Sequence, residues 1–430
     1  MPFNIPTSTK PRLVIIGAGF AGFTLAHNLK SQDFQIVLLD KNNYHQFQPL
    51  FYQVAMSGLE PSSICFPLRK NFQNQDALYV RVAEVQRIDT IQKKIESNVG
   101  FLNYDFLVLA MGAETNYYGN PNFEKYSIPL KSVSEALYLR NSILDDLEKA
   151  VTTLHLEEQE HLLNIIIVGG GPTGVELAGA LAEMKRHILP KDYPDLNSQK
   201  MEIHVIQASD RLLDTMSKKS SLKAYQNLIK MGVQIHLNEK VLDVFENKVS
   251  LSSGMQLIAN KIIWAAGVKG VPIFGLPESS KAPGSKIKVN SFCEVEGVDG
   301  IYAIGDLAYH VDEKFPKGLP GLAPVALQQA RYLAKQLIAQ QNAESKSPFI
   351  YIDKGSMATI GRNKAVIDFK NIFLSGFIAW IGWLFIHIYY LIGVRNKIIV
   401  FINWTWNYIF YDQALRLNIK PKTTNVFKDI

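Results

Sequence analysis

Two glycine-rich segments carry the clearest chemical signal in this sequence. Gly17, Gly19 and Gly22 follow the β-branched run RLVIIG and begin a segment with helical periodicity. In this GxGxxG spacing the first glycine makes a tight turn, the second lets a pyrophosphate approach the backbone, and the third permits close helix packing. The start of the following helix adds N–H groups and positive dipole for the phosphates. We therefore expect a dinucleotide site at this turn.

An acidic residue ends the next predicted strand. Asp40 closes the run QIVLLD, 18 residues after Gly22, where a carboxylate accepts hydrogen bonds from the hydroxyls of an adenosine ribose. A glycine turn by itself often has only a structural role, so the strand, the spacing and the acid are needed together. In combination they predict a strand, helix and parallel strand that bind a dinucleotide.

The same pattern returns about 150 residues later in the chain. Gly169, Gly171 and Gly174 follow the run NIIIV, but the matching strand ends in Gln207, where an acid is expected. An uncharged amide repels a ribose 2′-phosphate less than a carboxylate does, and Arg211 lies nearby in the sequence. We therefore predict NADH as the electron donor with NADPH tolerated. The alternative is that Gln207 is merely a polar strand end.

Two dinucleotide sites in one chain suggest that electrons pass between two bound nucleotides. Cys65 and Cys293 lie far apart and have neither CxxC nor metal-ligand spacing, so we expect no dithiol centre, disulfide framework or metal site. Any electron carrier must then be a bound cofactor. We expect FAD in the first site and a nicotinamide dinucleotide in the second, because a flavin can accept a hydride and release electrons singly or in pairs.

Composition and length fit a folded α/β protein with two Rossmann-like domains. The chain has 430 residues, of which 47% are hydrophobic and 20% are charged, so we expect two or three domains and little disorder. Its net charge of +6 comes from scattered Lys and Arg, which argues against nucleic-acid binding. Residues 1–12 contain three prolines and no apolar stretch, so they do not read as a signal peptide.

The extra hydrophobicity of the chain is concentrated near its end. Residues 372–394 contain no charged side chain across 23 positions, and a second apolar run covers residues 398–410. The first run is long enough to cross a bilayer. Its internal glycines, its tryptophans and tyrosines, and the basic Arg395 and Lys397 between the two runs favour amphipathic helices that lie in the membrane interface instead.

Taken together, these motifs resemble the flavoproteins with two dinucleotide-binding domains, and within them the type II NADH:quinone oxidoreductases. The resemblance covers nearly the whole chain. It rests on the segments VIIGAGFAG, QPLFYQVA, LVLAMGAETN, IIIVGGGPTGVELAGAL, IIWAAGV, IYAIGDLA and GFIAWIGWLFIHIYYLIGVRNK. Related disulfide reductases and sulfide:quinone oxidoreductases need reactive cysteines, and Cys65 and Cys293 match neither pattern.

The resemblance implies a glutathione-reductase-like fold in which the flavin domain is interrupted. We expect the FAD-binding domain in residues 1–115 and 271–345, and the NAD(P)H-binding domain in residues 116–270 with a Rossmann core from about 163. Residues 346–430 would form a region that anchors the protein to the membrane and makes a dimer.

The resemblance also implies a set of site residues. Those expected at FAD are Gly17, Gly19, Gly22, Asp40, Lys41, Val82, Ala110, Gly112, Gly305, Asp306 and Ala323. Those expected at NADH are Gly169, Gly171, Thr173, Gly174, Gln207 and Gly267. Glu176, expected on the first turn of its helix, is the candidate catalytic acid near the nicotinamide and the flavin. The alternatives are that Asp306 only caps a helix and that Glu176 is a surface glutamate at a helix start.

The expected quinone residues are Pro324, Gln328 and Trp383. Family members carry two glutamines four residues apart, and here Pro324 replaces the first while Gln328 matches the second. Proline offers no hydrogen-bond donor, which makes quinone recognition depart from the family pattern. Trp383 stands where some relatives carry lysine, so we expect aromatic stacking or membrane contact there rather than a proton relay.

The implied activity is non-electrogenic transfer of a hydride from NADH to FAD and then of two electrons to menaquinone or ubiquinone in a respiratory chain. We expect a homodimer that binds lipid peripherally on the cytoplasmic face of the inner or plasma membrane. Two alternatives remain: an NADH:ferredoxin-type reductase, and an NADH-binding flavoprotein whose redox state is a signal. Turnover with a soluble quinone, compared with a ferredoxin or cytochrome, discriminates among the three.

Overall fold

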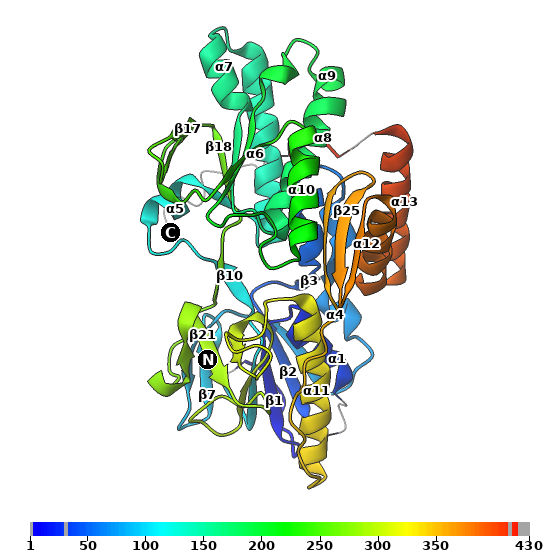
Figure 1. Cartoon of the computed structure of the whole chain (residues 1–430). Coiled ribbons are helices and arrows are strands. Elements are labelled where there is room, and N and C mark those ends of the chain that lie inside the picture. Colours follow the sequence, from blue (N-terminus) through cyan, green and yellow to red (C-terminus); the bar gives the residue numbers. More distant parts are fainter. Residues whose placement is uncertain (1–2, 30–32, 412–414, 420–430) are drawn as a thin grey trace, which may run out of the picture. The chain divides into compact units, whose positions relative to one another are not determined.

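The computed structural model describes residues 3–29, 33–411 and 415–419, and its contacts divide the chain into two units. Unit 1 consists of Met1–Phe47, Cys65–Asn116 and Val268–Lys354. Unit 2 consists of Gln48–Ile64, Tyr117–Gly267 and Gly355–Ile430. Each unit contains its own five-stranded parallel sheet (Figure 1), which confirms the predicted α/β class with two Rossmann-like sheets.

The sheet of unit 1 has the strand order β22-β9-β1-β2-β5. The strands are β1 (Arg12–Ile16), β2 (Gln35–Asp40), β5 (Leu78–Val82), β9 (Phe106–Leu109) and β22 (Ile301–Ala303). β1, β2, β9 and β22 are mostly buried apolar runs, as expected where a parallel sheet is covered on both faces, whereas the edge strand β5 buries only Val80. Helices α1 (Phe20–Asn28) and α11 (Ala323–Gln341) pack side by side. Because all five strands run the same way, the residues that follow them collect at one edge of the sheet.

Shorter elements complete unit 1. They are β3 (Tyr44–Gln46) with β4 (Cys65–Pro67), α4 (Leu68–Asn71), the sheet β6 (Val85–Asp89), β7 (Lys94–Ser97) and β8 (Gly100–Asn103), the pair β10 (Ala113–Thr115) and β19 (Val268–Gly270), and the sheet β20 (Lys281–Ala282), β21 (Lys286–Val289) and β23 (Ala308–His310). Side chains of β6, β7, β8, β21 and β23 share one apolar core with side chains of the main sheet.

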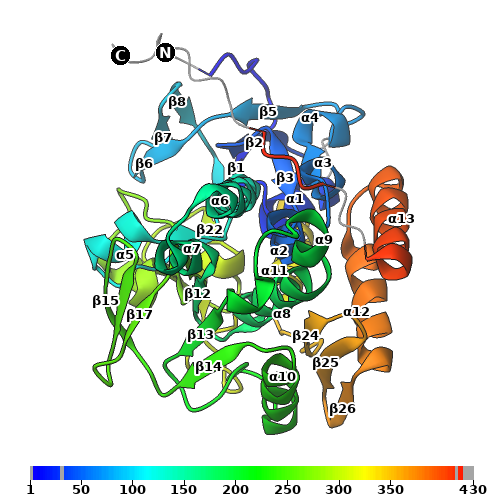
Figure 2. The same cartoon turned by 90° about the horizontal axis from the view of Figure 1, so that it is seen from above.

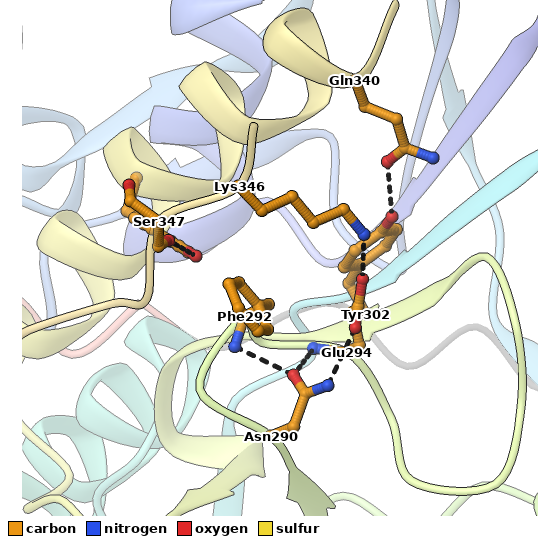
Figure 3. Close-up of polar contacts among 8 residues, drawn as sticks. Asn290, Phe292, Glu294, Tyr302, Gln340, Lys346 and Ser347 are labelled. Atoms are coloured by element: carbon orange, nitrogen blue, oxygen red, sulfur yellow. Dashed lines mark hydrogen bonds and ion pairs between the residues drawn. The ribbon is translucent and has the colours of Figure 1, made fainter. Parts of the chain in front are cut away.

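A cluster of polar contacts ties the end of α11 to the turn before β22. Lys346 Nζ lies 2.5 Å from Glu294 Oε1, and Asn290 Nδ2 donates to Glu294 Oε2 at 2.8 Å (Figure 3). Tyr302, within β22, donates its hydroxyl proton to Gln340 Oε1 at 3.2 Å. These contacts hold β22 against α11, and β22 leads directly into one of the predicted cofactor turns.

The sheet of unit 2 has the strand order β11-β18-β12-β13-β14, again all parallel. Its strands are β11 (Ile128–Pro129), β12 (Ile165–Val168), β13 (Ile203–Gln207), β14 (Gln234–Leu237) and β18 (Lys261–Trp264). The accompanying helices are α2 (Phe51–Ala55), α3 (Pro61–Ile64), α5 (Pro121–Tyr126), α6 (Val133–Thr152), α7 (Leu156–Leu163), α8 (Pro172–His187), α9 (Leu189–Asp192) and α10 (Lys218–Lys230). An antiparallel sheet of β15 (Val241–Phe245), β16 (Lys248–Leu251) and β17 (Gln256–Ile258) lies within the same unit.

The last part of unit 2 is an antiparallel sheet followed by two helices. The elements are β24 (Ser356–Gly361), β25 (Lys364–Phe369), β26 (Ile372–Ser375), α12 (Phe377–Tyr390) and α13 (Val394–Phe410). Figure 2 shows α12 beside both this sheet and α13. Among the residues that the structure describes, no helix combines the length and the apolar character needed to cross a bilayer. Of the region predicted as 346–430, residues 412–414 and 420–430 lie outside the described residues.

Candidate functional site

The first glycine turn lies at the carboxyl edge of the unit 1 sheet. Gly17 follows β1 with φ +99°, and a Cβ on Gly22 would come within 1.8 Å of Gly17 O, so the helix can pack here only because both residues are glycine. Gly19 is the N-cap of α1, and no described residue has an atom within 4 Å of the place its Cβ would take. The turn therefore presents open helix N–H groups of the kind that bind a pyrophosphate.

Asp40 faces this turn from the end of β2. Its Oδ2 accepts a hydrogen bond from Ala18 N at 2.7 Å, and its Oδ1 accepts one from Asn42 N at 2.7 Å. Burial raises the pKa of the carboxyl, and the two backbone N–H groups oppose that shift. The side chain is thus oriented by the backbone beside the glycine turn, where the sequence predicted a ribose-binding acid.

Each strand of the unit 1 sheet leads into a predicted cofactor residue. Gly305 follows β22 with φ +74°, and Ala110 follows β9. Val82 ends β5 and is half-exposed. The structure therefore gathers at one sheet edge the predicted residues Gly17, Gly19, Asp40, Lys41, Val82, Ala110, Gly112, Gly305 and Asp306.

The start of α11 contains the two adjacent glutamines of the segment ALQQA. Ala323 and Pro324 form the first turn of the helix. The amide of Gln328 is engaged with the backbone of Ile352, donating to its oxygen at 2.9 Å and accepting from its nitrogen at 3.0 Å. Gln329, which sequence reasoning missed, is 1% exposed, and its Oε1 accepts a hydrogen bond from Gly305 N at 2.8 Å. A polar residue on the buried face of an apolar helix was the only signal that could have indicated it.

The second glycine turn repeats the first within unit 2. Gly169 follows β12 with φ +111°, and a Cβ on Gly174 would come within 1.9 Å of Gly169 O. Gly171 is the N-cap of α8, and the space for its Cβ is open among the described residues. Gln207 ends β13, as predicted, and accepts a hydrogen bond from Gly170 N at 2.7 Å. Thr173, on the first turn of α8, and Gly267, after β18, complete the predicted set.

For Glu176 the structure corrects the predicted place in the first turn of its helix and contradicts the alternative of a surface glutamate. It is the fifth residue of α8, so it lies in the second turn, and it is 9% exposed rather than on the surface. Burial raises the pKa of its carboxyl to about 8, while the N–H of Thr359, 3.4 Å from Glu176 Oε1, and the indole of Trp383 oppose the shift. At neutral pH this carboxyl therefore holds a proton inside the protein.

Beside Glu176 lies a pocket of about 100 Å³ within unit 2. Its walls come from α2, α8, β24, α12 and α13, and its aromatic members are Tyr52, Trp380, Trp383, Trp404, Tyr408 and Tyr411. Glu183 and Arg362 add two ionisable side chains, and Glu183 Oε1 accepts a hydrogen bond from Arg362 N. The pocket thus combines apolar ring surface with a protonated carboxyl, which suits a flat, weakly polar molecule that gains protons.

Trp383 is the central aromatic side chain of this pocket. It is 1% exposed, stacks on His387 with ring centroids 3.9 Å apart, and meets Trp404 at 5.6 Å. Burial lowers the pKa of His387 to about 4, so its ring is neutral near pH 7. Of the two roles expected for Trp383, the structure therefore shows aromatic stacking, and its burial removes it from the lipid-accessible surface.

A line of hydrogen bonds joins α13 to the α2 wall of the pocket. Trp404 Nε1 donates to Gln53 Oε1 at 2.6 Å, and Gln53 Nε2 donates to the Tyr52 hydroxyl at 2.8 Å. Burial raises the pKa of Tyr52 well above its usual value, and the charge of Glu176 acts in the same direction. The contact between α13 and α2 was not predicted from sequence, because Gln53 and Trp404 are 351 positions apart.

Two family models match the chain, and together they span nearly all of it. Residues 11–330 match the pyridine nucleotide-disulphide oxidoreductase family, and residues 354–411 match the NDH2 C-terminal domain. The type II NADH:quinone oxidoreductase Ndh of Mycobacterium tuberculosis is 33% identical over 95% of this chain and 91% of that protein. An internal alternative NAD(P)H-ubiquinone oxidoreductase A1 of Solanum tuberosum mitochondria is 29% identical over 93% of this chain and 87% of its own length.

Among solved structures, the fold is similar to that of NDH2 from Plasmodium falciparum in complex with NADH. The TM-score is 0.86 at 22% sequence identity, and the match covers 96% of this chain and all of that one. At this identity the likeness bears on the fold, and it agrees with the two-sheet architecture described above.

Proposed function

The chain belongs to the type II NADH:quinone oxidoreductases, and from that premise we propose how its residues divide the work. The enzyme is an FAD-dependent oxidoreductase that transfers electrons from NADH to quinone. Bound FAD supplies the chemistry, because a flavin accepts a hydride and passes electrons onward. The protein binds and orients the cofactor and the substrates, and it supplies protons.

We assign FAD to the glycine turn of unit 1. Its open helix N–H groups at Gly19 would bind the pyrophosphate, and Asp40, already oriented by Ala18 N, would accept from the ribose hydroxyls. The turn at Gly305, which follows β22 and donates a hydrogen bond to Gln329, would also contact the cofactor. NADH is assigned to the matching turn of unit 2, with its pyrophosphate at Gly171.

We place the quinone head in the pocket beside Glu176. The observation that carries this proposal is a carboxyl buried among aromatic rings whose pKa of about 8 keeps it protonated at neutral pH. Reduction of a quinone adds two protons to its oxygens, and a protonated Glu176 can donate one of them without drawing water into the pocket. Pro324 and Gln328 remain predicted quinone residues in unit 1, although the Gln328 amide already serves Ile352.

The test compares Glu176→Gln with Glu183→Gln, a second carboxyl of the same pocket. We expect Glu176→Gln to lower kcat with ubiquinone or menadione by about 10²-fold, which is typical for loss of a general acid. Reduction of the flavin by NADH in a stopped-flow experiment without quinone should keep its rate. Glu183→Gln should retain most quinone turnover. Equal quinone turnover by the Glu176 variant and the native enzyme would remove Glu176 from this role.

We further propose that helices α12 and α13 attach the enzyme to the membrane surface. Their described residues include many exposed large apolar side chains, among them Ile378, Ile381, Phe385, Ile402 and Trp406. Such a surface is typical of amphipathic helices that lie in a lipid interface. A homodimer and attachment to the cytoplasmic face stay predictions. Light scattering of the detergent-solubilised enzyme and protease accessibility in oriented vesicles test them.

A further inference from the structure

Each glycine turn lies beside the end of a neighbouring strand, but the side chain at that strand end differs between the units. It is Asp40 at the end of β2 in unit 1 and Gln207 at the end of β13 in unit 2. In unit 1, Asp40 accepts from the backbone of Ala18 with one oxygen and from Asn42 N with the other. In unit 2, Gln207 Oε1 accepts from Gly170 N in the same way, but the other arm of its side chain is Nε2, a donor. That nitrogen points to Ser209 Oγ at 2.5 Å. Residue 207 therefore offers only one side-chain acceptor, Oε1, which already accepts from Gly170 N, and it carries no negative charge.

A carboxylate from the following loop stands next to this donor. Asp214 Oδ2 lies 3.4 Å from Gln207 Nε2 and 3.2 Å from Ser209 Oγ, and both of these groups can donate to it. Asp214 is an exposed residue, so a ligand can reach it. Its Oδ1 accepts no hydrogen bond from the residues that the structure describes. Asp214 thus supplies, beside Gln207, the negative charge that position 207 lacks.

The loop that carries Asp214 is held firmly against the glycine turn. Leu213 N donates to Gly170 O at 2.8 Å, and the side chains of Leu212 and Leu213 are fully buried. Leu213 has φ +48°, a left-handed conformation that a leucine adopts only when its surroundings impose it. Arg211 Nη2 donates to Asp214 O at 2.6 Å and closes the loop. These contacts fix the backbone of residue 214 relative to the phosphate-binding turn.

We propose that Asp214 is the residue that selects NADH over NADPH, with Gln207 as the positioning residue that orients it. This inference rests on the assignment of NADH to unit 2. The Asp214 carboxylate accepts hydrogen bonds from the adenosine ribose hydroxyls and repels the 2′-phosphate of NADPH. The amide at position 207 is then required, because a second carboxylate 3.4 Å from Asp214 would repel it. The tolerance of NADPH predicted from Gln207 alone gives the opposite expectation.

The experiment combines equilibrium binding with turnover. Binding of ADP-ribose and of its 2′-phosphate to the holoenzyme is measured by titration calorimetry, and kcat/KM is measured for NADH and NADPH with menadione. The variants are Asp214→Asn, the swap Gln207→Glu with Asp214→Asn, and Asp210→Asn as a control carboxylate in the same loop. The thermal midpoint of each variant shows that it is folded.

We expect the native enzyme to prefer NADH and to bind ADP-ribose more tightly than its 2′-phosphate. Asp214→Asn should weaken ADP-ribose binding about tenfold or more, the usual effect of losing hydrogen bonds to a charged group. It should also improve kcat/KM for NADPH, since Arg211 remains to pair with the phosphate. The swap should recover the preference for NADH, and Asp210→Asn should behave like the native enzyme.

Two results overturn the inference. In one, Asp214→Asn discriminates between NADH and NADPH as well as the native enzyme does. In the other, the native enzyme has the same kcat/KM for NADPH as for NADH. If Asp214→Asn is unstable but the swap folds, the swap decides, because it keeps Asp214→Asn and returns one carboxylate at position 207. It should then recover the preference for NADH, and a swap that folds without this preference would also overturn the inference. Native ADP-ribose binding without any quinone turnover would instead contradict the proposed function and leave the nucleotide assignment in place.

Discussion

At the scale of single residues, Glu176 gives the stability of the protein a defined pH dependence. Its pKa is about 8 in the folded chain, against an ordinary value of 4.5 that applies when the chain is unfolded. Between these values the unfolded chain has released a proton that the folded chain retains, so the free energy of unfolding falls as pH rises. The limiting slope is about 1.4 kcal/mol per pH unit. Below pH 4.5 the contribution is fully present, and above pH 8 it is lost.

Glu176→Gln should abolish this slope. The variant keeps an acceptor for Thr359 N but carries no ionisable group, so we expect it to be more stable than the native enzyme at pH 8 and similar at pH 4.5. Urea unfolding at several pH values measures the difference, and the exposed Glu158→Gln serves as the control. A difference in stability that does not change with pH would show that Glu176 titrates normally.

The residues that sequence reasoning missed have a common physical cause. Glycine turns and strand-end residues are predictable because their spacing is imposed by the local backbone. Gln329 and Asp214 are different, because each acts on a turn through a contact that the tertiary fold creates: Gln329 with Gly305, and Asp214 with Gln207. In the same way, the raised pKa of Glu176 follows from burial by segments distant in sequence, and no local pattern encodes it.

At the scale of elements, the two helices that begin at glycine turns depend on glycine for two separable reasons. In α8 a Cβ on Gly174 would meet Gly169 O at 1.9 Å, so Gly174→Ala should destabilise unit 2 by several kcal/mol through forced backbone movement. The Cβ of Gly171→Ala would meet no described atom and should leave stability nearly unchanged. That Cβ would occupy the approach of the pyrophosphate, so KM for NADH should rise about tenfold or more.

Thermal unfolding and steady-state kinetics on both variants check this separation. The corresponding glycines of α1 should behave in the same way. Gly22→Ala should destabilise unit 1, and Gly19→Ala should lose bound flavin with little change in stability. A Gly171→Ala enzyme with native KM would show that the dinucleotide does not pass this turn.

At the scale of the whole molecule, the two parallel sheets were predictable and the assignment of one segment was not. The sheets follow from buried β-branched runs that alternate with glycine turns, a pattern with few alternative topologies. Residues 48–64, which we expected within the first flavin segment, pack in unit 2, where α2 contacts α6 and α8, and α13 contacts α3. Asn396 Nδ2, for example, donates to Ser62 O at 2.9 Å. The packing of residues 48–64 in unit 2 depends on contacts with apolar side chains distant in sequence, which a short run like QPLFYQVA does not specify.

Our proposal that α12 and α13 attach the enzyme to a membrane rests on the apolar side chains that these two helices expose. Deleting both helices would be a poor test, because it would also remove their buried side chains Trp383 and Val400, which pack inside unit 2. Single charges on the exposed face avoid this problem. Phe385 is 68% exposed and Ile402 56% exposed, so Phe385→Glu and Ile402→Glu should leave the fold intact.

Each substitution removes an apolar side chain from the lipid interface, a loss of roughly 1.5–3 kcal/mol before the cost of the charge, so binding to phosphatidylcholine vesicles should weaken by at least about tenfold. Vesicle flotation measures it. Turnover with soluble menadione should persist. Leu154→Glu, which alters an even more exposed apolar residue outside these helices, should bind vesicles normally. Native binding should survive high salt, since burial of apolar surface is not screened as charge attraction is. Release of the native enzyme by salt alone, with no effect of either glutamate, would mean that charge rather than this apolar face holds the enzyme to lipid.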